Sequence, residues 1–506
     1  MRSPIVLKSV RLEVGKILTV IILVAFFALP AYCQLAVPLT IQEALYPGAP
    51  TTGIARSQDP VTVGVPIADS SRITSTSQLG LSGATVGQFR VLGRWPSGNI
   101  MWVQVDTQAD VPAGGKNTSV FLTTGSGNFG GSNLAVDNGG SITVNTGPAQ
   151  FTIRKANFNL FDSVMVNGKQ LVAPGTSAGL VMMGPAPGAT SCGVCNVPYA
   201  SVNDPASTAV IEENGPARAS LRVSGSHVDS AGHAYMHYTV RMQFYKGKAY
   251  AKVEVILRNA DETTNTAGDF NSAFKGFASY EARITPALGS GRHFNIGSDT
   301  PTSVSGSFSG TENAYLYQAY SKDMEWPDWN ITNCSPTVTG RCTVSYIGRT
   351  TTSGSNGSFT YSYAQDGYQI VHGSSVLLQA NHTKYPQGWA DLSDSTGAGI
   401  EVAFTNWRAT GRSRCSLSMA VPKSASGSGL TKACFRPVAG SPITRLGRSI
   451  PSTICSWIFI TPLYLLPLTP FFPTSIICWR GLPSASTTRL VYFRFRCLIP
   501  LRKTIT

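Results

Sequence analysis

The chain contains 506 residues, of which 42% are hydrophobic and 13% charged, with 50 glycines and 31 prolines. This hydrophobic content excludes a disordered chain, and the many glycines and prolines disfavour a helical bundle. The net charge of +14 has a local source, because 14 of the 40 Lys and Arg residues follow Glu401, the last acidic residue. The other 26 basic residues match 26 acidic ones, which disfavours a nucleic-acid partner for the body of the chain.

Residues 1–33 have the features of a secretory signal peptide. Four basic residues precede an apolar run at 17–29, which is too short to span a bilayer comfortably. Ala31 and Cys33 then place small side chains at the −3 and −1 positions of a cleavage site before Gln34. The segment predicts export, and therefore a secreted, periplasmic or extracellular location. An uncleaved membrane anchor is the alternative.

Export makes disulfide bonds possible for the cysteines in the body of the chain. Two pairs are close in sequence and lie in or around loops, so we predict two local disulfides, Cys192 with Cys195 and Cys334 with Cys342. A zinc site built from all four thiolates is the alternative. His233 and His237 share one strand face, but no third ligand is evident nearby, so we expect no metal and no cofactor.

Segments with alternating or β-branched residues recur along the body of the chain with turn residues between them, and they predict an all-β protein. They are 61–67, 88–94, 100–106, 119–124, 150–161, 217–224, 233–245, 250–258, 280–284, 376–381 and 399–405. Residues 245–249 predict a hairpin turn between two long strands. A Gly-, Ser- and Asn-rich stretch follows the early strands, so we place a first domain at 34–124, a linker at 125–142 and a larger domain at 143–408.

Aromatic residues in polar, loop-rich segments are candidates for sugar binding. A sugar ring has an apolar face and hydroxyl edges, so it binds to an aromatic plane flanked by polar groups. Trp326 and Trp329 lie in such a segment, and Trp389 with Asp391 lies in another. We predict these four residues as substrate-binding residues. The alternative is that the rings pack inside the β-structure, which is the commoner environment of Trp.

Two groups of segments resemble a known family. QFRVLGRWPSGNIMWVQVD at 88–106, followed by ADVPAGG at 109–115, resembles the N-terminal RIFT-type barrel of exo-rhamnogalacturonan lyase-like proteins. FYKGKAY at 244–250 and GWADLSD at 388–394 resemble the central β-sandwich of that family. The resemblance covers about residues 38–406. It implies a small RIFT-type β-barrel followed by a larger β-sandwich, and a polysaccharide or oligosaccharide partner of pectic type.

Residues 409–506 depart from this pattern, because they contain no acidic residue and are rich in Arg, Ser, Pro and Cys. At this place the resemblance implies a C-terminal α/α toroid, where most of the active cleft is expected. A shifted reading frame restores acidic and His residues to the segment, so we interpret 409–506 as a frameshifted, poorly structured, non-globular tail. The alternative is a genuine basic and apolar tail that attaches the protein to a membrane.

The sequence therefore predicts a secreted carbohydrate-active protein related to exo-acting polysaccharide lyases. Such a lyase removes the proton at C5 of a uronic acid and expels the oxygen at C4, which requires a base and a group that neutralises the carboxylate. No such pair is evident within residues 1–406, so the catalytic residues stay unassigned and we expect the chain as written to be inactive. A non-catalytic glycan-binding protein or an envelope scaffold is the alternative.

Overall fold

The computed structural model describes residues 35–43, 53–125, 129, 131–189, 195–259, 277, 279–299, 303–319, 368–380 and 386–404, and the backbone of strands at 350–356, 359–365, 412–418, 432–437, 454–460 and 493–495. In these ranges the chain forms β-strands and three short 3-10 helices, η1 (Asp69–Ser71), η2 (Thr76–Gln78) and η3 (Ser201–Asn203), which confirms the all-β fold class. None of the described helices could span a lipid bilayer. The predicted signal peptide, 1–33, lies outside the described residues.

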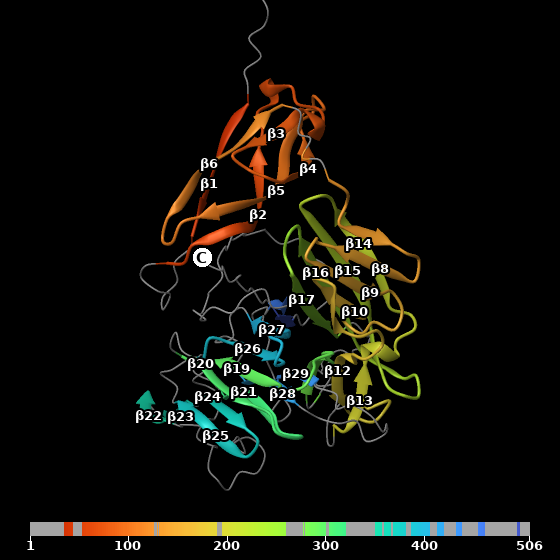
Figure 1. Ribbon diagram of the computed structural model, residues 1–506, viewed down its shortest axis with the longest axis vertical. Coiled ribbons are helices and arrows are strands. Elements are labelled where there is room, and N and C mark those ends of the chain that lie inside the picture. The colour runs from red at the N-terminus through yellow and green to blue at the C-terminus, as the bar shows by residue number, and fades with distance from the viewer. Residues whose placement is uncertain are drawn as a thin grey trace, which may run out of the picture.

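The N-terminal domain is a small barrel of two antiparallel three-stranded sheets, with strand orders β1-β6-β3 and β2-β5-β4 (Figure 1). Its strands are β1 (Ala36–Gln42), β2 (Arg56–Pro66), β3 (Leu79–Ser82), β4 (Gly87–Arg94), β5 (Ile100–Val111) and β6 (Lys116–Thr124). Aliphatic side chains from both sheets, including the fully buried Leu79, Ile100 and Leu122, form one hydrophobic core. Burial of these side chains holds the two sheets together.

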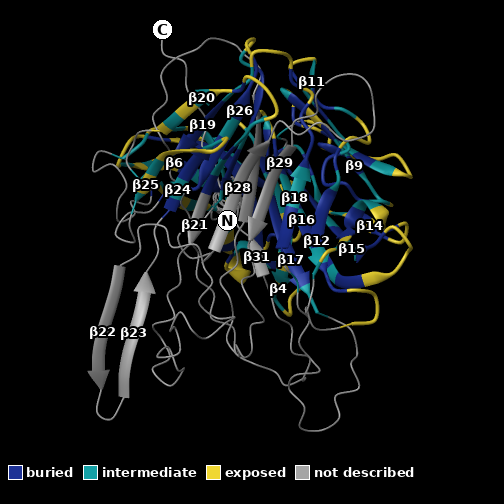
Figure 2. Ribbon diagram, turned by 90° about the horizontal axis from the view of Figure 1, so that it is seen from below, coloured by how far each residue is buried: buried dark blue, intermediate teal, exposed yellow. Residues whose placement is uncertain are grey.

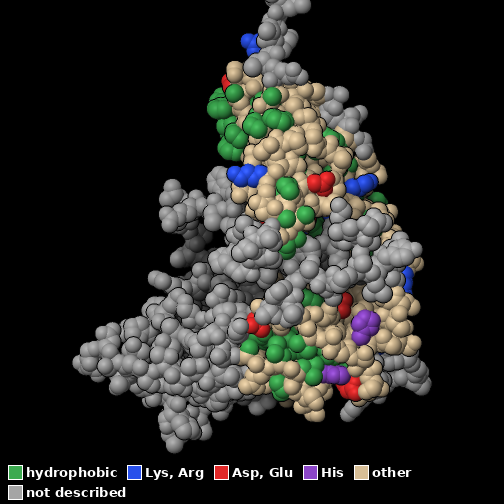
Figure 3. All heavy atoms as spheres, turned by 60° about the vertical axis from the view of Figure 1, so that its left-hand side comes forward, with side chains coloured by type: hydrophobic (Ala, Val, Ile, Leu, Met, Phe, Trp, Pro, Cys, Tyr) green, Lys and Arg blue, Asp and Glu red, His purple; other side chains and the backbone are tan. Residues whose placement is uncertain are grey.

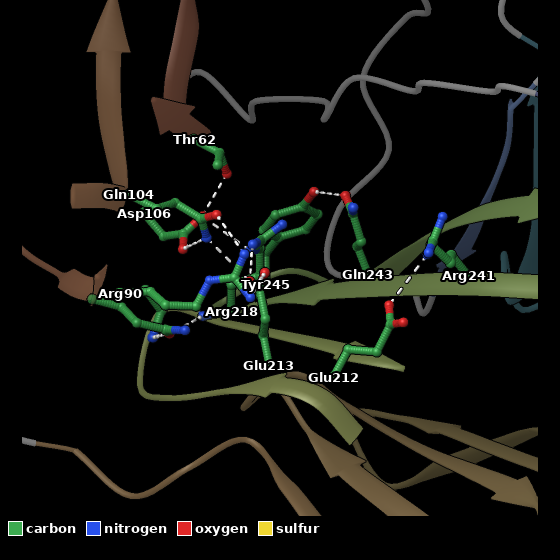
Figure 4. A network of polar contacts seen from close by, with 12 residues as sticks. Thr62, Arg90, Gln104, Asp106, Glu212, Glu213, Arg218, Arg241, Gln243 and Tyr245 are labelled. Atoms are coloured by element: carbon green, nitrogen blue, oxygen red, sulfur yellow. Dashed lines mark hydrogen bonds and ion pairs between the residues drawn. The ribbon is translucent and has the colours of Figure 1, made fainter. Parts of the chain in front are cut away.

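Strand β5 is buried on both faces, and its alternation gives each face a different partner. Val103 and Val105 belong to the barrel core. The intervening Gln104 and Asp106 are also buried, at 9% and 2% exposure, and point toward the second domain (Figure 4). The predicted strand at 100–106 is therefore one of the elements through which the barrel contacts the rest of the molecule.

The second domain begins with a five-stranded antiparallel sheet in the order β11-β10-β9-β8-β7. Its strands are β7 (Ala135–Asp137), β8 (Ser141–Asn145), β9 (Ala149–Arg154), β10 (Ser163–Val166) and β11 (Lys169–Val172). Alternate residues of β8 and β9 are buried, as expected for a sheet with one face on a core.

A much larger antiparallel sheet packs against the first and continues across the lower part of Figure 1. Its first strands are β12 (Gly179–Gly184), β13 (Val197–Ala200), β14 (Thr208–Asn214), β15 (Arg218–Val228), β16 (Ala234–Tyr245), β17 (Tyr250–Arg258) and β18 (Ser279–Ile284). It continues through β19 (His293–Gly297), β20 (Ser303–Ser307), β21 (Asn313–Ala319), β24 (Tyr368–His372), β25 (Ser375–Ala380), β26 (Trp389–Ser393) and β27 (Gly399–Phe404).

For the remaining strands the structure describes the backbone, and four of these strands follow residue 408. These are β28 (Arg412–Ser418), β29 (Lys432–Pro437), β30 (Ile454–Ile460) and β31 (Phe493–Phe495), all paired within the large sheet. The hairpin β22 (Thr350–Asn356) and β23 (Phe359–Gln365) forms a separate two-stranded sheet. The other residues of the predicted tail lie outside the described part of the chain.

The sandwich core lies between the two sheets and is rich in aromatic side chains. Phe151 of the small sheet and Phe244 of the large sheet are fully buried, with ring centroids 5.0 Å apart. The same cluster extends from Leu134 to Val402 in sequence, whereas the barrel core ends at Leu122. Figure 2 shows the consequence, because the central strands are buried while exposed residues gather in the turns.

The hairpin predicted at residues 245–249 is confirmed. Strands β16 and β17 pair in antiparallel register from His237 with Arg258 to Phe244 with Ala251. Gly247 in the turn has a φ of 70°, a conformation that glycine adopts without steric cost. The turn brings Tyr245 and Tyr250 close together, with ring centroids 5.9 Å apart.

Candidate functional site

A group of charged side chains, all largely buried except for Arg90 at 51% exposure, joins the barrel to the sandwich (Figure 4). Arg218, the first residue of β15, places its Nε 2.9 Å from Oδ1 of Asp106 on β5, and these side chains are 7% and 3% exposed. Arg218 also pairs with Glu213 of β14, which in turn lies 3.2 Å from a guanidinium nitrogen of Arg90 on β4. We call Arg90, Asp106, Glu213 and Arg218 the interdomain cluster.

Hydrogen bonds complete the interdomain cluster. Nε2 of Gln104 donates to Oδ2 of Asp106 at 2.9 Å and to Oε2 of Glu213 at 3.1 Å, and the Thr62 hydroxyl donates to Asp106. Burial raises the pKa of Asp106, while the Arg218 charge and the hydrogen bonds from Thr62 and Gln104 act in the opposite direction. A buried charge that is paired and hydrogen-bonded in this way fixes the geometry of the interface.

A β-bulge in β14 places two successive carboxylates on one face of the large sheet. The register of β14 against β15 shifts between Ile211 and Glu213, so Glu212 is an extra residue in its strand. Strict alternation would turn one of the two carboxylates toward the core. Instead, Glu213 enters the interdomain cluster, while Oε1 and Oε2 of Glu212 lie 2.9 Å from Nε of Arg222 and 3.2 Å from Nε of Arg241.

Arg222 and Arg241 are direct cross-strand partners on β15 and β16. Their side chains are 40% and 43% exposed, and that of Glu212 is 28% exposed. We call these three residues the arginine pair site. In Figure 4 Glu212 and Arg241 lie to one side of the interdomain cluster and are not covered by the barrel strands drawn there.

The face of the large sheet that carries the arginine pair site continues across the neighbouring strands. The register pairs Arg241 with Glu254 of β17. Farther along β17, Tyr250 and Glu401 of β27 are both paired with the same residue of β30, which lies between their strands. Glu401 is in turn the partner of Asp391 on β26. Direct partners in an antiparallel sheet project to the same side. We call this side the outer face, because the alternate residues of the same strands belong to the sandwich core.

Two of the predicted sugar-binding residues, Trp389 and Asp391, lie on the outer face. Trp389 is 8% exposed; its Nε1 donates to Oε1 of Gln387 at 2.9 Å, and its ring lies against the backbone of Gly297. Asp391 is half-buried, and its Oδ1 lies 3.4 Å from the hydroxyl of Ser393, which is 2.9 Å from Nε2 of His293. Their role in binding stays a prediction.

Trp326 and Trp329, the other predicted sugar-binding residues, lie outside the described residues. The same holds for Cys192, Cys334 and Cys342. Cys195 is described and is disulfide-bonded. The predicted pairings therefore stay predictions.

A histidine and a tyrosine form a hydrogen-bonded pair inside the sandwich. Nδ1 of His227 lies 3.0 Å from the carbonyl oxygen of Met236, and its Nε2 lies 3.3 Å from the hydroxyl of Tyr280. A carbonyl only accepts, so Nδ1 carries the proton and Nε2 accepts from Tyr280. His227 is fully buried, and burial lowers its pKa to about 4. The pair is closed to a substrate in this structure and acts as a structural element.

No group of three or more His, Cys, Asp or Glu side chains in the described part of the chain is arranged to hold a metal ion. Figure 3 shows one face of the molecule, on which the described basic and acidic side chains are scattered rather than gathered by sign. Recognition by charge would therefore depend on local arrangements such as the arginine pair site.

The arginine pair site was missed from the sequence, although a signal for part of it exists. The predicted strand at 217–224 places Arg218 and Arg222 four residues apart, and therefore on one face. The pairing of Arg222 with Arg241 depends on the register between two strands. The position of Glu212 depends on a bulge, which the alternation pattern does not predict.

The comparisons with known proteins bear on the sandwich that carries these residues. No curated protein sequence matches the chain. One similar solved structure is a TPR-domain containing protein from Parabacteroides distasonis, with 8% identity, a TM-score of 0.31, and coverage of 83% of this chain and 59% of that one. Another is a protein in glycosyl hydrolase family 38 from Enterococcus faecalis, with 11% identity, a TM-score of 0.30, and coverage of 84% and 61%.

The chain thus spans about three fifths of the length of these two structures. A family model gives a more specific result, because residues 134–265 match the PcRGLX-like protein central beta sandwich domain. The matched range runs from β7 through β17 and includes Glu212, Arg218, Arg222 and Arg241. Residues 134–265 thus support the resemblance of the sandwich to exo-rhamnogalacturonan lyase-like proteins.

Proposed function

We propose that this protein is a secreted carbohydrate-active protein that binds acidic polysaccharide of pectic type without cleaving it. The observation that carries the proposal is the family match over residues 134–265, because this range includes the half-exposed cations of the outer face. A rhamnogalacturonan-like chain contains uronic acid units, and their carboxylates are complementary to arginine side chains. Asp391 and Glu401 are cross-strand partners on the same face.

The absence of cleavage is part of the proposal, and the surroundings of two described histidines, His227 and His293, support it. Proton abstraction requires a base within hydrogen-bond reach of the proton at C5. His227, which has a tyrosine partner, is fully buried, and Nε2 of His293 is 2.9 Å from the hydroxyl of Ser393. Neither imidazole stands beside the arginine pair site in the strand register. The outer face is therefore better suited to binding a uronic acid than to abstracting its C5 proton.

Retention on an immobilised pectic glycan tests the binding proposal. We expect the full chain to be retained, and we expect a variant with Trp326→Ala and Trp329→Ala to be retained less. Trp102→Ala is the matched control, because Trp102 is a Trp of the barrel with 36% exposure. Absence of retention of the unchanged protein would contradict the proposal and favour an envelope scaffold.

Absorbance of the unsaturated sugar tests the absence of cleavage. We expect no increase in this absorbance when the full chain is incubated with rhamnogalacturonan or polygalacturonate. A steady increase that scales with protein concentration would show a lyase and overturn the second half of the proposal.

Secretion can be tested separately by N-terminal sequencing of protein recovered outside the cytoplasm. Cleavage by signal peptidase should leave Gln34 as the first residue. Recovery of the protein with residues 1–33 intact, in the membrane fraction, would favour the uncleaved anchor.

A further inference from the structure

The arginine pair site places two like charges in the least favourable relation that a sheet allows. Arg222 and Arg241 are directly opposite each other on β15 and β16. Like charges in this position destabilise a sheet. A partly exposed ion pair with one shared carboxylate returns little stability. Arrangements that work against stability occur at functional sites, so we treat the two arginines as a candidate ligand-binding site.

Glu212 accepts a hydrogen bond from the Nε of each guanidinium group, with Oε1 facing Arg222 and Oε2 facing Arg241. It contacts Nε of Arg222 at 2.9 Å and Nε of Arg241 at 3.2 Å. Of the four terminal nitrogens, one from Arg222 donates to the Ser224 hydroxyl at 3.3 Å. The terminal nitrogens of Arg241 make no hydrogen bond to the described residues. The carboxylate therefore orients two planar groups and leaves donors available for a further acceptor.

The neighbouring charges limit the kind of anion that fits. Two arginines and Glu212 leave one positive charge at the site. Glu254, the cross-strand partner of Arg241, adds a buried carboxylate nearby at 8% exposure, and no ion pair joins it to Arg241 among the described contacts. With Glu254 counted, the four charged side chains sum to zero, so the site carries no large positive charge and suits a singly charged planar carboxylate better than a phosphate dianion.

An apolar side chain lies in the same row of the sheet. Val210 of β14 is the cross-strand partner of Arg222 and is 41% exposed. The row Val210, Arg222 and Arg241 therefore offers an apolar surface followed by two cations. A uronic acid has a matching arrangement, with the apolar face of its ring beside its carboxylate.

We infer that Arg222 and Arg241, oriented by Glu212, bind the carboxylate of one uronic acid unit of the polysaccharide, with the sugar ring over Val210. This inference rests on the proposed function and specifies it, since it names the site and the group that is recognised. Arg222 and Arg241 are binding residues, and Glu212 is a positioning residue.

Calorimetric titration of the full chain with trigalacturonate tests the inference. Replacing a charge-assisted hydrogen-bond donor at a binding site weakens affinity by roughly tenfold. We therefore expect Arg222→Gln and Arg241→Gln each to weaken trigalacturonate binding by about tenfold, and the double variant by more. Arg222→Lys keeps the charge but loses the planar fork, so it should also bind several-fold more weakly.

Arg154→Gln is the matched control, because Arg154 lies on β9 of the other sheet. It should bind as the unchanged protein does. Thermal unfolding of every variant checks that the fold is intact, which is expected because the replaced side chains are half-exposed. Equal affinity of the unchanged protein and a folded double variant would overturn the inference and leave the proposed function standing. No binding of trigalacturonate or of longer pectic chains by the unchanged protein would overturn the proposed function, and this site with it.

Discussion

Glu212 and Glu213 are neighbours in sequence, carry the same charge and pair with arginines of the same strand, yet their surroundings differ. Glu213 is 12% exposed and shares Arg218 with the buried Asp106. Glu212 is 28% exposed and pairs with Arg222 and Arg241, which are 40% and 43% exposed. The first group contacts Asp106 and Arg90 of the barrel, and Figure 4 shows Glu212 and Arg241 to one side of these residues.

The difference shows that burial, rather than residue type, separates a structural ion pair from a candidate binding site. Charges removed from water must be paired within the protein, because an unpaired buried charge is costly. Charges that stay partly in water interact weakly with one another and can exchange a water molecule for a ligand. Three predictions test this comparison.

The largest effect is expected for Arg218→Met, which keeps much of the apolar stem and removes the charge. Asp106 and Glu213 would then be left without their shared cation inside the interface. We expect the free energy of unfolding to fall by roughly 4 kcal/mol, as for other broken buried ion pairs. Denaturant unfolding followed by tryptophan fluorescence measures the change.

Arg222→Met is the matched control for this measurement, because it removes the same group on the same strand and the same face. It should change the free energy of unfolding by less than about 1 kcal/mol. Similar losses for the two variants would show that the barrel does not distinguish the two groups, and the comparison would fail.

An intermediate effect is expected from pH, through a polar group buried in the sandwich core. His227 is neutral in the folded state because burial lowers its pKa to about 4, whereas its usual value is 6.5. The unfolded chain binds a proton below about pH 6.5, so the stability is fully present above that pH and is lost as pH falls toward 4. We expect a loss of about 2 kcal/mol between about pH 7.5 and about pH 4.5.

The pH dependence should be compared with that of His227→Gln, whose side chain does not titrate. This variant is expected to be less stable at neutral pH, since it disturbs the contacts with Met236 and Tyr280. Its stability should nevertheless fall less between the two pH values. An unchanged slope would show that other groups produce the pH dependence.

The smallest effect is expected for Glu212→Gln, which removes the charge that lies between Arg222 and Arg241. We expect the variant to be less stable by under about 1 kcal/mol, because the pairs are partly exposed. Salt should reduce the difference by screening the repulsion between the two arginines. Thermal unfolding at low and high salt measures both effects, and a large, salt-independent loss would place Glu212 among the buried structural groups.

Much of the fold followed from the sequence, because alternation and turn residues are local signals. The all-β class, the hairpin at residues 245–249 and the resemblance of the central sandwich to the lyase-like family are confirmed. Each of these predictions depends on short segments in which side chains alternate along a strand or match a known motif. The pattern of β5 also predicted a strand, but not that its polar side would be buried against another domain.

The candidate site could not be predicted in the same way. The sequence by itself determined that Arg218 and Arg222 share a strand face, that the body of the chain has balanced charge, and that 250–258 pairs with the strand before it. Only the tertiary structure decided that Arg241 stands opposite Arg222, that a bulge turns both Glu212 and Glu213 to one face, and that Arg218 is buried against the barrel while Arg222 stays half-exposed. These features arise from register and domain packing, which bring together residues far apart in the chain and are not encoded in any single segment.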